Sequence, residues 1–481
     1  MASNITNPNL SEVPKSIIRS SVPSTLYNLT KELSSFVFDT ARWFVISALG
    51  RIKKGEVVIE DSVAGRTLRF GCNGGLTTTL VVKNRNLWWR VMMSSSIGFS
   101  ESYMLGEVEC FDITMFLEIM ILNREALSDM SSPLSSVLSA VAGWTRVSNL
   151  AAVSLANVRA HYDISNAIFE AFLSPDMTYS CPIWPSQETV PAIFSLNDTP
   201  THIPTASLEQ AQIHKLRYII TQARISPGDR VLEIGTGWGS FAIEAAKSVP
   251  GCHVTSLTLS AEQKREAEAR ILAAGLEDRI TILLQDYRSL SGTMNGNDVD
   301  DGKQGHFDKI VSIEMLEHVG KDHLPAYFSV VNTLLKKSGG IAVFQTSTMP
   351  ETRYHIYNEG NDFIRQYIFP GAHLPTVTKL IASAHEGSKG DLIPDQFLNI
   401  GGHYSKCLRE WKNNFVNSFE DRIRPALMKK KSGIDCSDDR ELQKKFYFSF
   451  CEAGFRTKTL GVSLLTFVRE GTVETLQGIK L

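Results

Sequence analysis

The chain has 481 residues, of which 43% are hydrophobic and 21% are charged, and its formal net charge at pH 7 is −2. This length predicts two or three domains, and the composition is typical of a globular protein. Because Lys and Arg do not outnumber Asp and Glu, the charge balance argues against binding to nucleic acid.

The N-terminal third predicts a small α+β domain. Residues 1–30 are rich in Ser, Asn and Pro, are expected to be disordered, and lack the apolar run of a secretory signal. Short β-type runs between Gly50 and Val91, including Leu87–Met93, predict a sheet, and helical periodicity follows from Ile113 to about Leu127. We therefore predict a domain over residues 31–130, followed by a linker helix over 131–160.

Two apolar segments raise the question of membrane contact. No apolar run reaches the roughly 18–20 residues that a spanning helix needs. Residues 36–49 and 131–158 could instead lie on a bilayer surface, and the first is followed by Arg51, Lys53 and Lys54. Packing of both segments against the protein's own core is the simpler interpretation.

The rest of the chain, residues 161–481, predicts a doubly wound α/β domain. From about Ile213 strands alternate with helices, as in a parallel sheet covered on both faces. We predict a helical lid insertion over residues 350–435 and an antiparallel edge from strands at 446–450 and 463–469. The core strands are predicted at 230–235, 253–259, 280–285, 307–313 and 340–346.

A glycine-rich turn, Gly235–Gly239, follows the first of these strands. Glycine lets the backbone turn sharply and lets a ligand approach closely, and the first N–H groups of the next helix are free to bind its polar end. Dinucleotide enzymes usually have a later third glycine and an acidic residue at the end of the second strand. Here that strand ends in Leu257–Ser260, without an acid.

The motifs around this turn resemble those of class I S-adenosylmethionine (SAM)-dependent methyltransferases and, among them, the cyclopropane-fatty-acyl-phospholipid synthases. The resemblance extends from Gly50 to Arg469, nearly the whole chain. It implies a Rossmann-like methyltransferase sheet with an antiparallel edge strand. The matching strings are G-x-x-E-S-Y-M-x-G at Gly98–Gly106, HYD-x-x-N at His161–Asn166, MTYSC at Met177–Cys181, TLS-x-x-Q at Thr258–Gln263 and E-H-V-G at Glu317–Gly320.

The resemblance implies a SAM site in which Thr258 and Gln263 handle the ribose and Asp286 and Tyr287 hold the adenine. A helix cap formed by Ser260 and Gln263 can coexist with that role, and a plain turn is the alternative for Asp286. The implied cofactor-binding set is Tyr179, Ser180, Glu233, Gly235, Thr236, Gly237, Trp238, Gly239, Thr258, Gln263, Asp286 and Tyr287.

The resemblance also implies a catalytic set without a metal. In the family a bicarbonate ion serves as the base, and its glutamate and tyrosine ligands correspond to Glu317 and Tyr404. Bacterial members place a histidine where this chain has Gln345, and glutamine cannot take a positive charge. Cys181 and Cys451 can instead be buried packing residues. The implied catalytic set is Cys181, Glu317, His318, Gln345, Tyr404 and Cys451.

The implied reaction is methylene transfer to the cis double bond of an unsaturated acyl chain of a phospholipid, which forms a cyclopropane ring through a carbocation. Aromatic faces could stabilise that cation. Reduction of the cation would give a methyl branch, so C-methylation of a lipid or of a secondary metabolite is one alternative, and a non-catalytic lipid-binding protein is another. The resemblance further implies a cytoplasmic enzyme that associates peripherally with a membrane and forms a homodimer. The aromatic candidates are Tyr179, Trp184, Phe363, Tyr367 and Tyr404.

Overall fold

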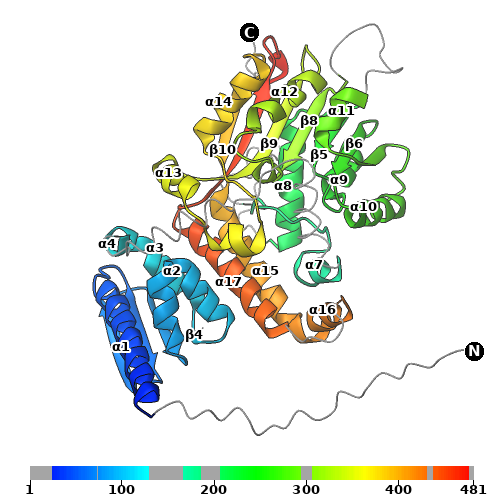
Figure 1. The fold of residues 1–481 in the computed structure, drawn as a ribbon. Coiled ribbons are helices and arrows are strands. Elements are labelled where there is room, and N and C mark those ends of the chain that lie inside the picture. The colour runs from blue at the N-terminus through cyan, green and yellow to red at the C-terminus, as the bar shows by residue number, and fades with distance from the viewer. Residues whose placement is uncertain are drawn as a thin grey trace, which may run out of the picture.

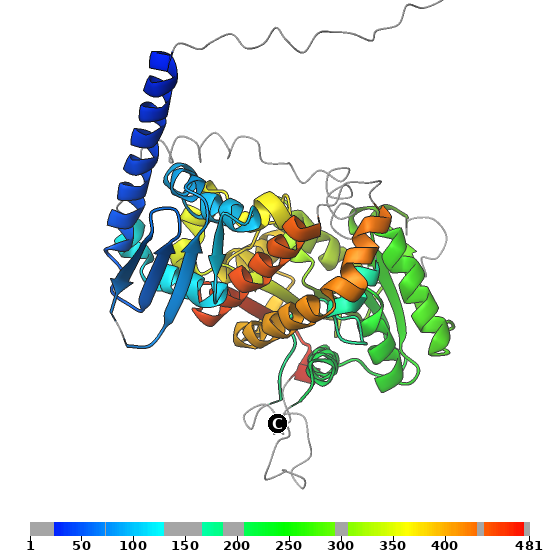
Figure 2. The same cartoon turned by 90° about the horizontal axis from the view of Figure 1, so that it is seen from below.

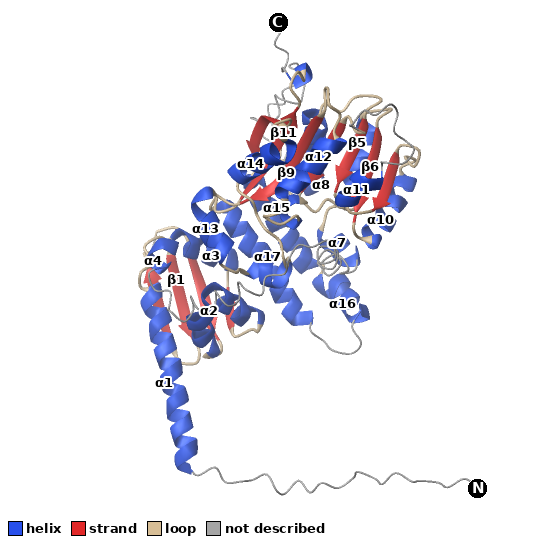
Figure 3. Ribbon diagram, turned by 45° about the horizontal axis from the view of Figure 1, so that its top comes forward, coloured by secondary structure: helices blue, strands red, loops and turns tan. Residues whose placement is uncertain are grey.

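The computed structural model describes residues 24–72, 74–128, 166–185, 206–293, 306–430 and 437–475. They form a four-stranded sheet near the N-terminus and a seven-stranded sheet in the rest of the chain, and helix α17 (Ser437–Arg456) contacts the helices of the N-terminal part (Figures 1 and 3). Among the described residues, no helix has both the length and the hydrophobicity to cross a membrane. The predicted linker helix, 131–160, lies outside the described residues.

The N-terminal part contains the predicted small sheet, in the order β2-β1-β3-β4. Strands β1 and β3 are parallel and the other neighbours are antiparallel. The first helix begins at Ser24, so residues 24–30 are helical and were wrongly expected to be disordered. The elements are α1 (Ser24–Leu49), β1 (Glu56–Asp61), β2 (Arg66–Gly71), β3 (Thr77–Val82), α2 (Asn86–Met104), β4 (Val108–Cys110), α3 (Ile113–Leu122) and α4 (Arg124–Ser128).

The β-type run at 87–93 was wrongly predicted as a strand, since it forms the first turns of α2. Its bulky residues favour strands locally, but tertiary packing decides the outcome. As part of a helix, Leu87 and Trp88 are buried in the same core as Phe99 and Tyr103. The guanidinium of Arg42, from α1, lies over the Trp88 ring, 5.7 Å from its centroid.

The C-terminal part is the predicted doubly wound sheet, in the order β10-β11-β9-β8-β5-β6-β7. Strand β11 runs antiparallel to both of its neighbours, whereas the other described neighbours in this sheet are parallel. The predicted fold class is therefore confirmed. The strands are β5 (Arg230–Ile234), β6 (His253–Thr258), β7 (Ile280–Leu284), β8 (Lys309–Ile313), β9 (Ile341–Thr348), β10 (Ile393–Asn399) and β11 (Gly461–Val468).

Helices cover both faces of this sheet because successive strand residues alternate between two cores. Val231 packs with one set of helices, while its neighbour Leu232 packs with the other. The first set is α8 (Leu208–Gln222), α9 (Ser240–Ser248) and α10 (Ala261–Ala273), and the second is α11 (Tyr287–Thr293), α12 (Leu324–Leu334) and α14 (Val377–Ser388).

The predicted strand at 446–450 is wrong, because these residues belong to α17. Phe446 and Phe448 are buried in a third core, formed by α17, α15 and the N-terminal helices. The strand beside β11 is instead β10, which lies inside the predicted helical insertion 350–435. Further elements are α7 (Asn166–Phe172), α13 (Glu351–Glu359), the π-helix Ile364–Ile368, α15 (Gly401–Asn417), the π-helix Phe419–Ile423 and α16 (Arg424–Lys430).

Candidate active site

The glycine turn floors a pocket at the carboxyl ends of the central strands. Gly235, Gly237 and Gly239 have φ values of 107°, 53° and 86°, which side chains other than glycine disfavour. A Cβ atom on Gly239 would also lie 3.3 Å from the Cβ of Ala267. The turn therefore needs its glycines, and it places helix α9 directly behind the pocket.

One pocket collects the predicted cofactor-binding residues, apart from Gly239, which supports the turn from behind. It is lined by Tyr179, Ser180, Glu233, Gly235, Thr236, Gly237, Trp238, Thr258, Gln263, Asp286 and Tyr287. These residues come from the MTYSC segment and from the ends of β5, β6 and β7. Lys215, Glu314 and His318 line the same pocket.

The predicted ribose and adenine residues lie at the end of the pocket formed by β6 and β7. The Thr258 hydroxyl donates to Oε1 of Gln263 at 2.8 Å, and Ser260 Oγ caps α10 by accepting the Gln263 N–H. The Ser260 N–H donates to Thr258 Oγ1 at 3.1 Å instead of to the Gln263 side chain, so the cap forms without the second bond of a capping box. Asp286 accepts from the Arg288 guanidinium at 2.7 and 2.9 Å. The pKa of Asp286 is lowered overall: burial acts to raise it, but the hydrogen bonds and charge of Arg288 outweigh the effect of burial.

The other end of the pocket lies between β5, α8 and the MTYSC segment. Glu233 is buried and accepts from Ser256 Oγ at 2.5 Å, and burial raises its pKa to about 8. From α8, Gln212 Nε2 donates to the carbonyl of Ser180 and Lys215 Nζ donates to its hydroxyl, both at 2.7 Å. These contacts hold the MTYSC segment against the pocket.

A carboxylate that we did not predict occupies the centre of the site. Glu314 directly follows β8 with a φ of 50°, and its Oε1 accepts from the backbone N–H of Cys181 and from Gln345 Nε2, both at 2.8 Å. Its Oε2 accepts from the Tyr404 hydroxyl at 2.9 Å. Burial raises the pKa of Glu314, whereas these donors and the charge of Lys215 lower it.

The structure thus brings Cys181, Gln345 and Tyr404 together. They bond to Glu314 and not to Glu317, the carboxylate that was predicted. Glu317 Oε1 accepts from the backbone N–H of Ser347, and Oε2 has no hydrogen-bond partner among the described residues. Burial, followed by the neighbouring Glu314 carboxyl, raises the pKa of Glu317, so its neutral form is favoured.

His318 lines the pocket and its ring lies 5.7 Å from that of Phe369. Burial lowers the pKa of His318 to about 4, so the imidazole is neutral near pH 7.

Neither predicted cysteine presents a thiolate to the pocket. The thiol of Cys181 is fully buried and points to the carbonyls of Pro182 and Ile400, and burial raises its pKa well above the usual range. Only the backbone N–H of Cys181 reaches Glu314. Cys451 lies on α17 beside the third core and is not among the pocket-lining residues, and burial also raises its pKa. These positions favour the packing interpretation of both thiols.

Aromatic rings extend from Tyr404, which bonds to Glu314, to neighbouring rings on α15, on α17 and in the MTYSC segment. We call Tyr179, Tyr404, Trp411 and Tyr447 the aromatic cluster. The Trp411 ring lies 5.1 Å from that of Tyr179 and 5.7 Å from that of Tyr404, and the hydroxyls of Tyr179 and Tyr447 are 2.9 Å apart. The other aromatic residues predicted to stabilise the cation lie elsewhere. The Phe363 ring contacts those of Tyr367 and Phe446, and the ammonium of Lys406 lies over the Trp184 ring.

Glu314 and Lys215 are among the polar pocket residues that were not predicted from the sequence. Glu314 had a visible signal, because it is the first residue after the fourth parallel strand, where ligands bind in this fold. Lys215 had a weaker one, as a lysine within the apolar stripe of α8 that includes Leu216 and Ile219.

Comparisons with known proteins show the family to which the chain belongs. The family model described as mycolic acid cyclopropane synthetase matches residues 151–464. The chain is 31% identical over 467 residues to the tuberculostearic acid methyltransferase UfaA1 of Mycobacterium tuberculosis, covering 92% of this chain and 99% of that protein. It is also 31% identical over 399 residues to the cyclopropane-fatty-acyl-phospholipid synthase of Escherichia coli, covering 82% and 89% of the two chains.

Solved structures show the same fold. The cyclopropane synthase MmaA2 from Mycobacterium tuberculosis matches with a TM-score of 0.51 and 23% sequence identity, over 65% of this chain and 97% of that chain. The chain therefore belongs to the cyclopropane synthase family and is a SAM-dependent methyltransferase.

Proposed function

We propose that this enzyme transfers the methyl group of SAM to the cis double bond of an unsaturated acyl chain in a phospholipid and closes a cyclopropane ring. The observation that carries the proposal is the Glu314 carboxylate, which lines the cofactor pocket and is bonded to Tyr404 of the aromatic cluster. A base, a methyl-donor pocket and apolar aromatic surroundings are what alkylation of an alkene requires. The similarity to a lipid-modifying synthase supports the substrate class.

The pocket fits SAM. Its positive-φ glycines leave room for close approach of a ligand, and its far end offers Gln263, Asp286 and Tyr287 to a nucleoside. When bound, SAM supplies an electrophilic methyl group to the alkene. The protein aligns the alkene with that methyl and keeps water away from it.

The aromatic cluster suits a cationic acyl chain. Faces of Tyr179, Tyr404 and Trp411 could each stabilise a desolvated cation by ~1–2 kcal/mol. Because Tyr404 and Trp411 are buried, water is held away from the cation and cannot trap it as an alcohol.

Glu314 is then the base. Its Oε2 accepts one hydrogen bond, from Tyr404, and keeps a lone pair. This oxygen takes a proton from the newly added methyl group, and the electrons of that C–H bond form the C–C bond that closes the ring. Gln345 and the N–H of Cys181 hold the carboxylate in place during this step.

A bicarbonate ion does not fit this arrangement. Tyr404, which was expected to bind it, and Gln345, which stands where bacterial members have the histidine ligand, are both bonded to the Glu314 carboxylate. The side chain thus takes the position expected for the ion, and no step of the proposed mechanism needs bicarbonate.

A methyl-branched or methylene-branched product is the second candidate. The similarity to a tuberculostearic acid methyltransferase favours it. If the same cation gave up a proton from a neighbouring chain carbon to the base, the product would be a methyl-branched alkene. If a hydride first shifted from the methylated carbon to the cationic carbon, loss of a proton from the added methyl group would give a methylene branch, and a saturated methyl branch would also require an external hydride donor. A non-catalytic lipid-binding role is less consistent with the intact glycine turn and the positioned carboxylate.

The product decides between these proposals. The purified protein is incubated with SAM and vesicles of a phospholipid with cis-monounsaturated chains, and the acyl chains are analysed by mass spectrometry for a gain of about 14 Da, one CH₂ group. Proton NMR then separates ring methylene from branched isomers. Methyl transfer only to sphingolipids or to free metabolites would overturn the phospholipid assignment.

Turnover is expected to depend on pH and not on bicarbonate. Burial raises the pKa of Glu314, so the acidic limb of the kcat profile should lie above the ordinary carboxyl value of about 4.3. Turnover rises with pH through this limb, because only the deprotonated carboxylate accepts a proton. Assays in CO₂-stripped buffer with and without added bicarbonate check the second point, and stimulation by bicarbonate would contradict it.

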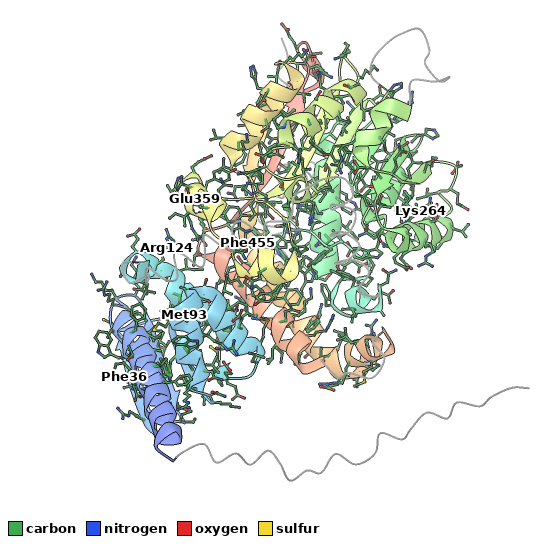
Figure 4. The ribbon with its side chains drawn as sticks, in the orientation of Figure 1. Phe36, Met93, Arg124, Lys264, Glu359 and Phe455 are labelled. Atoms are coloured by element: carbon green, nitrogen blue, oxygen red, sulfur yellow. The ribbon has the colours of Figure 1, made fainter. Side chains whose placement is uncertain are left out.

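We further propose that α1 associates with a membrane surface. Phe36 and Trp43, seven residues apart on this helix, are 70% and 68% exposed, and Arg51, Lys53 and Lys54 are exposed just beyond its end. Helix α1 lies at the edge of the N-terminal part, far from the seven-stranded sheet (Figures 2 and 4). Exposed aromatic side chains beside basic ones suit an anionic lipid surface.

The double variant Phe36→Ser/Trp43→Ser is expected to bind anionic vesicles at least about a hundredfold more weakly, because inserting each ring contributes roughly 1.5–3 kcal/mol. Vesicle co-sedimentation measures this, with Leu272→Ser as the matched control. Leu272 is 63% exposed on α10, at the opposite end of the molecule (Figure 1). Unchanged binding of the double variant would remove α1 from the membrane contact.

A further inference from the structure

Lys215 is a fully buried lysine in the cofactor pocket, with 0% of its surface exposed. Removing an ammonium group from water costs several kcal/mol unless an anion or several acceptors replace the water. Lys215 Nζ carries three donors, and one is used by Ser180 Oγ at 2.7 Å. Among the described residues no carboxylate lies within ion-pair distance of Lys215, although the carboxyls of Glu314 and Asp176 act on its charge from farther away.

The position of Lys215 in the pocket indicates which part of a ligand it faces. The nucleoside residues Gln263 and Asp286 follow strands β6 and β7, whereas Lys215 and Glu233 lie at the opposite end, on α8 and β5. In the sheet, β5 and β7 lie on either side of β6. A ligand with its nucleoside at β6 and β7 therefore extends its amino-acid tail toward Lys215 and Glu233.

The charges at this end match an amino acid. Such a tail carries one carboxylate and one ammonium, and the pocket offers one ammonium, on Lys215, and one carboxyl, on Glu233. Burial raises the pKa of Glu233 to about 8, and an ammonium ligand would favour its ionised form. Burial likewise lowers the pKa of Lys215, and a carboxylate ligand would favour its charged form.

We propose that Lys215 binds the α-carboxylate of SAM, opposite Glu233 at the α-ammonium, and so selects cofactors that retain this carboxylate. The inference rests on the identity of the cofactor and is independent of the proposed lipid substrate and of the role of Glu314. Ser180, bonded to Lys215, places the MTYSC segment over the same end of the tail.

The competing role for Lys215 is electrostatic support of Glu314, whose pKa its charge lowers. The two roles differ in one respect. Support of Glu314 affects turnover, whereas recognition of a carboxylate affects the choice between cofactor analogues in the absence of any lipid.

The test is calorimetric binding of two ligands to the full chain without lipid. S-adenosylhomocysteine has the carboxylate, and its decarboxylated analogue, S-adenosyl-3-thiopropylamine, lacks only that group. We expect the wild-type protein to prefer S-adenosylhomocysteine by roughly 10- to 100-fold, as for a hydrogen-bonded charge pair. In Lys215→Met, affinity for S-adenosylhomocysteine should fall by a similar factor, while affinity for the analogue should stay the same or rise.

Gln212→Met is the matched control. Gln212 lies one turn before Lys215 and holds the Ser180 carbonyl at 2.7 Å, but it carries no charge. It should weaken both ligands by the same factor and leave the preference intact. Equal affinities in the wild-type protein, or a preference that persists in Lys215→Met, would overturn the proposal. Because the wild-type comparison needs no variant, misfolding of Lys215→Met would not protect the proposal.

Discussion

Glu314→Gln is expected to lower kcat by about three orders of magnitude while cofactor affinity changes little, since a positioned general base contributes roughly 10²- to 10⁴-fold. Glutamine has the same shape and its oxygen can still accept from Cys181, so the site should keep its geometry. Its amide cannot take a proton from the substrate. Turnover on unsaturated phospholipid and calorimetry with S-adenosylhomocysteine measure the two quantities separately.

Glu317→Gln is the control for this variant, because it makes the same chemical change three residues away. Glu317 is already favoured in its neutral form and bonds to the backbone of Ser347, so we expect a loss of less than about tenfold. Should Glu317→Gln lose turnover while Glu314→Gln stays active, the catalytic carboxylate would be Glu317, as the sequence comparison implied.

Glu452→Ala is expected to lower the free energy of unfolding by roughly 3 kcal/mol, the cost of removing one partner of a buried ionic group. Glu452 is 1% exposed on α17 and accepts from Arg409 at 2.8 Å, Lys412 at 3.3 Å and, from α3, Thr114 at 3.2 Å. The alanine variant leaves Lys412 partly buried without its counter-charge, where α17 contacts the N-terminal part.

Urea denaturation measures this loss, and Glu420→Ala serves as the control. Glu420 pairs with Arg424 at 2.8 Å, but its side chain is 70% exposed, so the variant should change stability by less than about 1 kcal/mol. Equal effects of the two variants would show that the Glu452 cluster does not stabilise the contact between the two parts.

The seven-stranded sheet could be predicted because its signal is local. Each of its parallel strands is a short apolar run between polar turns, and the turn at Gly235–Gly239 needs its glycines for reasons of backbone geometry alone. The same local reasoning failed for residues 87–93 and 446–450. Their aromatic side chains suit a strand or a buried helix equally well, and packing of α2 and α17 against neighbouring helices decided in favour of helix.

By itself, the sequence determined the fold class, the cofactor pocket and the identity of many groups in it, because motifs keep their residues at constant spacing along the chain. Only the tertiary structure decided which carboxylate those groups serve. Cys181, Gln345 and Tyr404 come from segments separated by up to 223 residues and converge on Glu314 rather than on Glu317. Hydrogen bonds depend on distance and angle in space, and spacing along the chain does not specify either when two glutamates stand three residues apart.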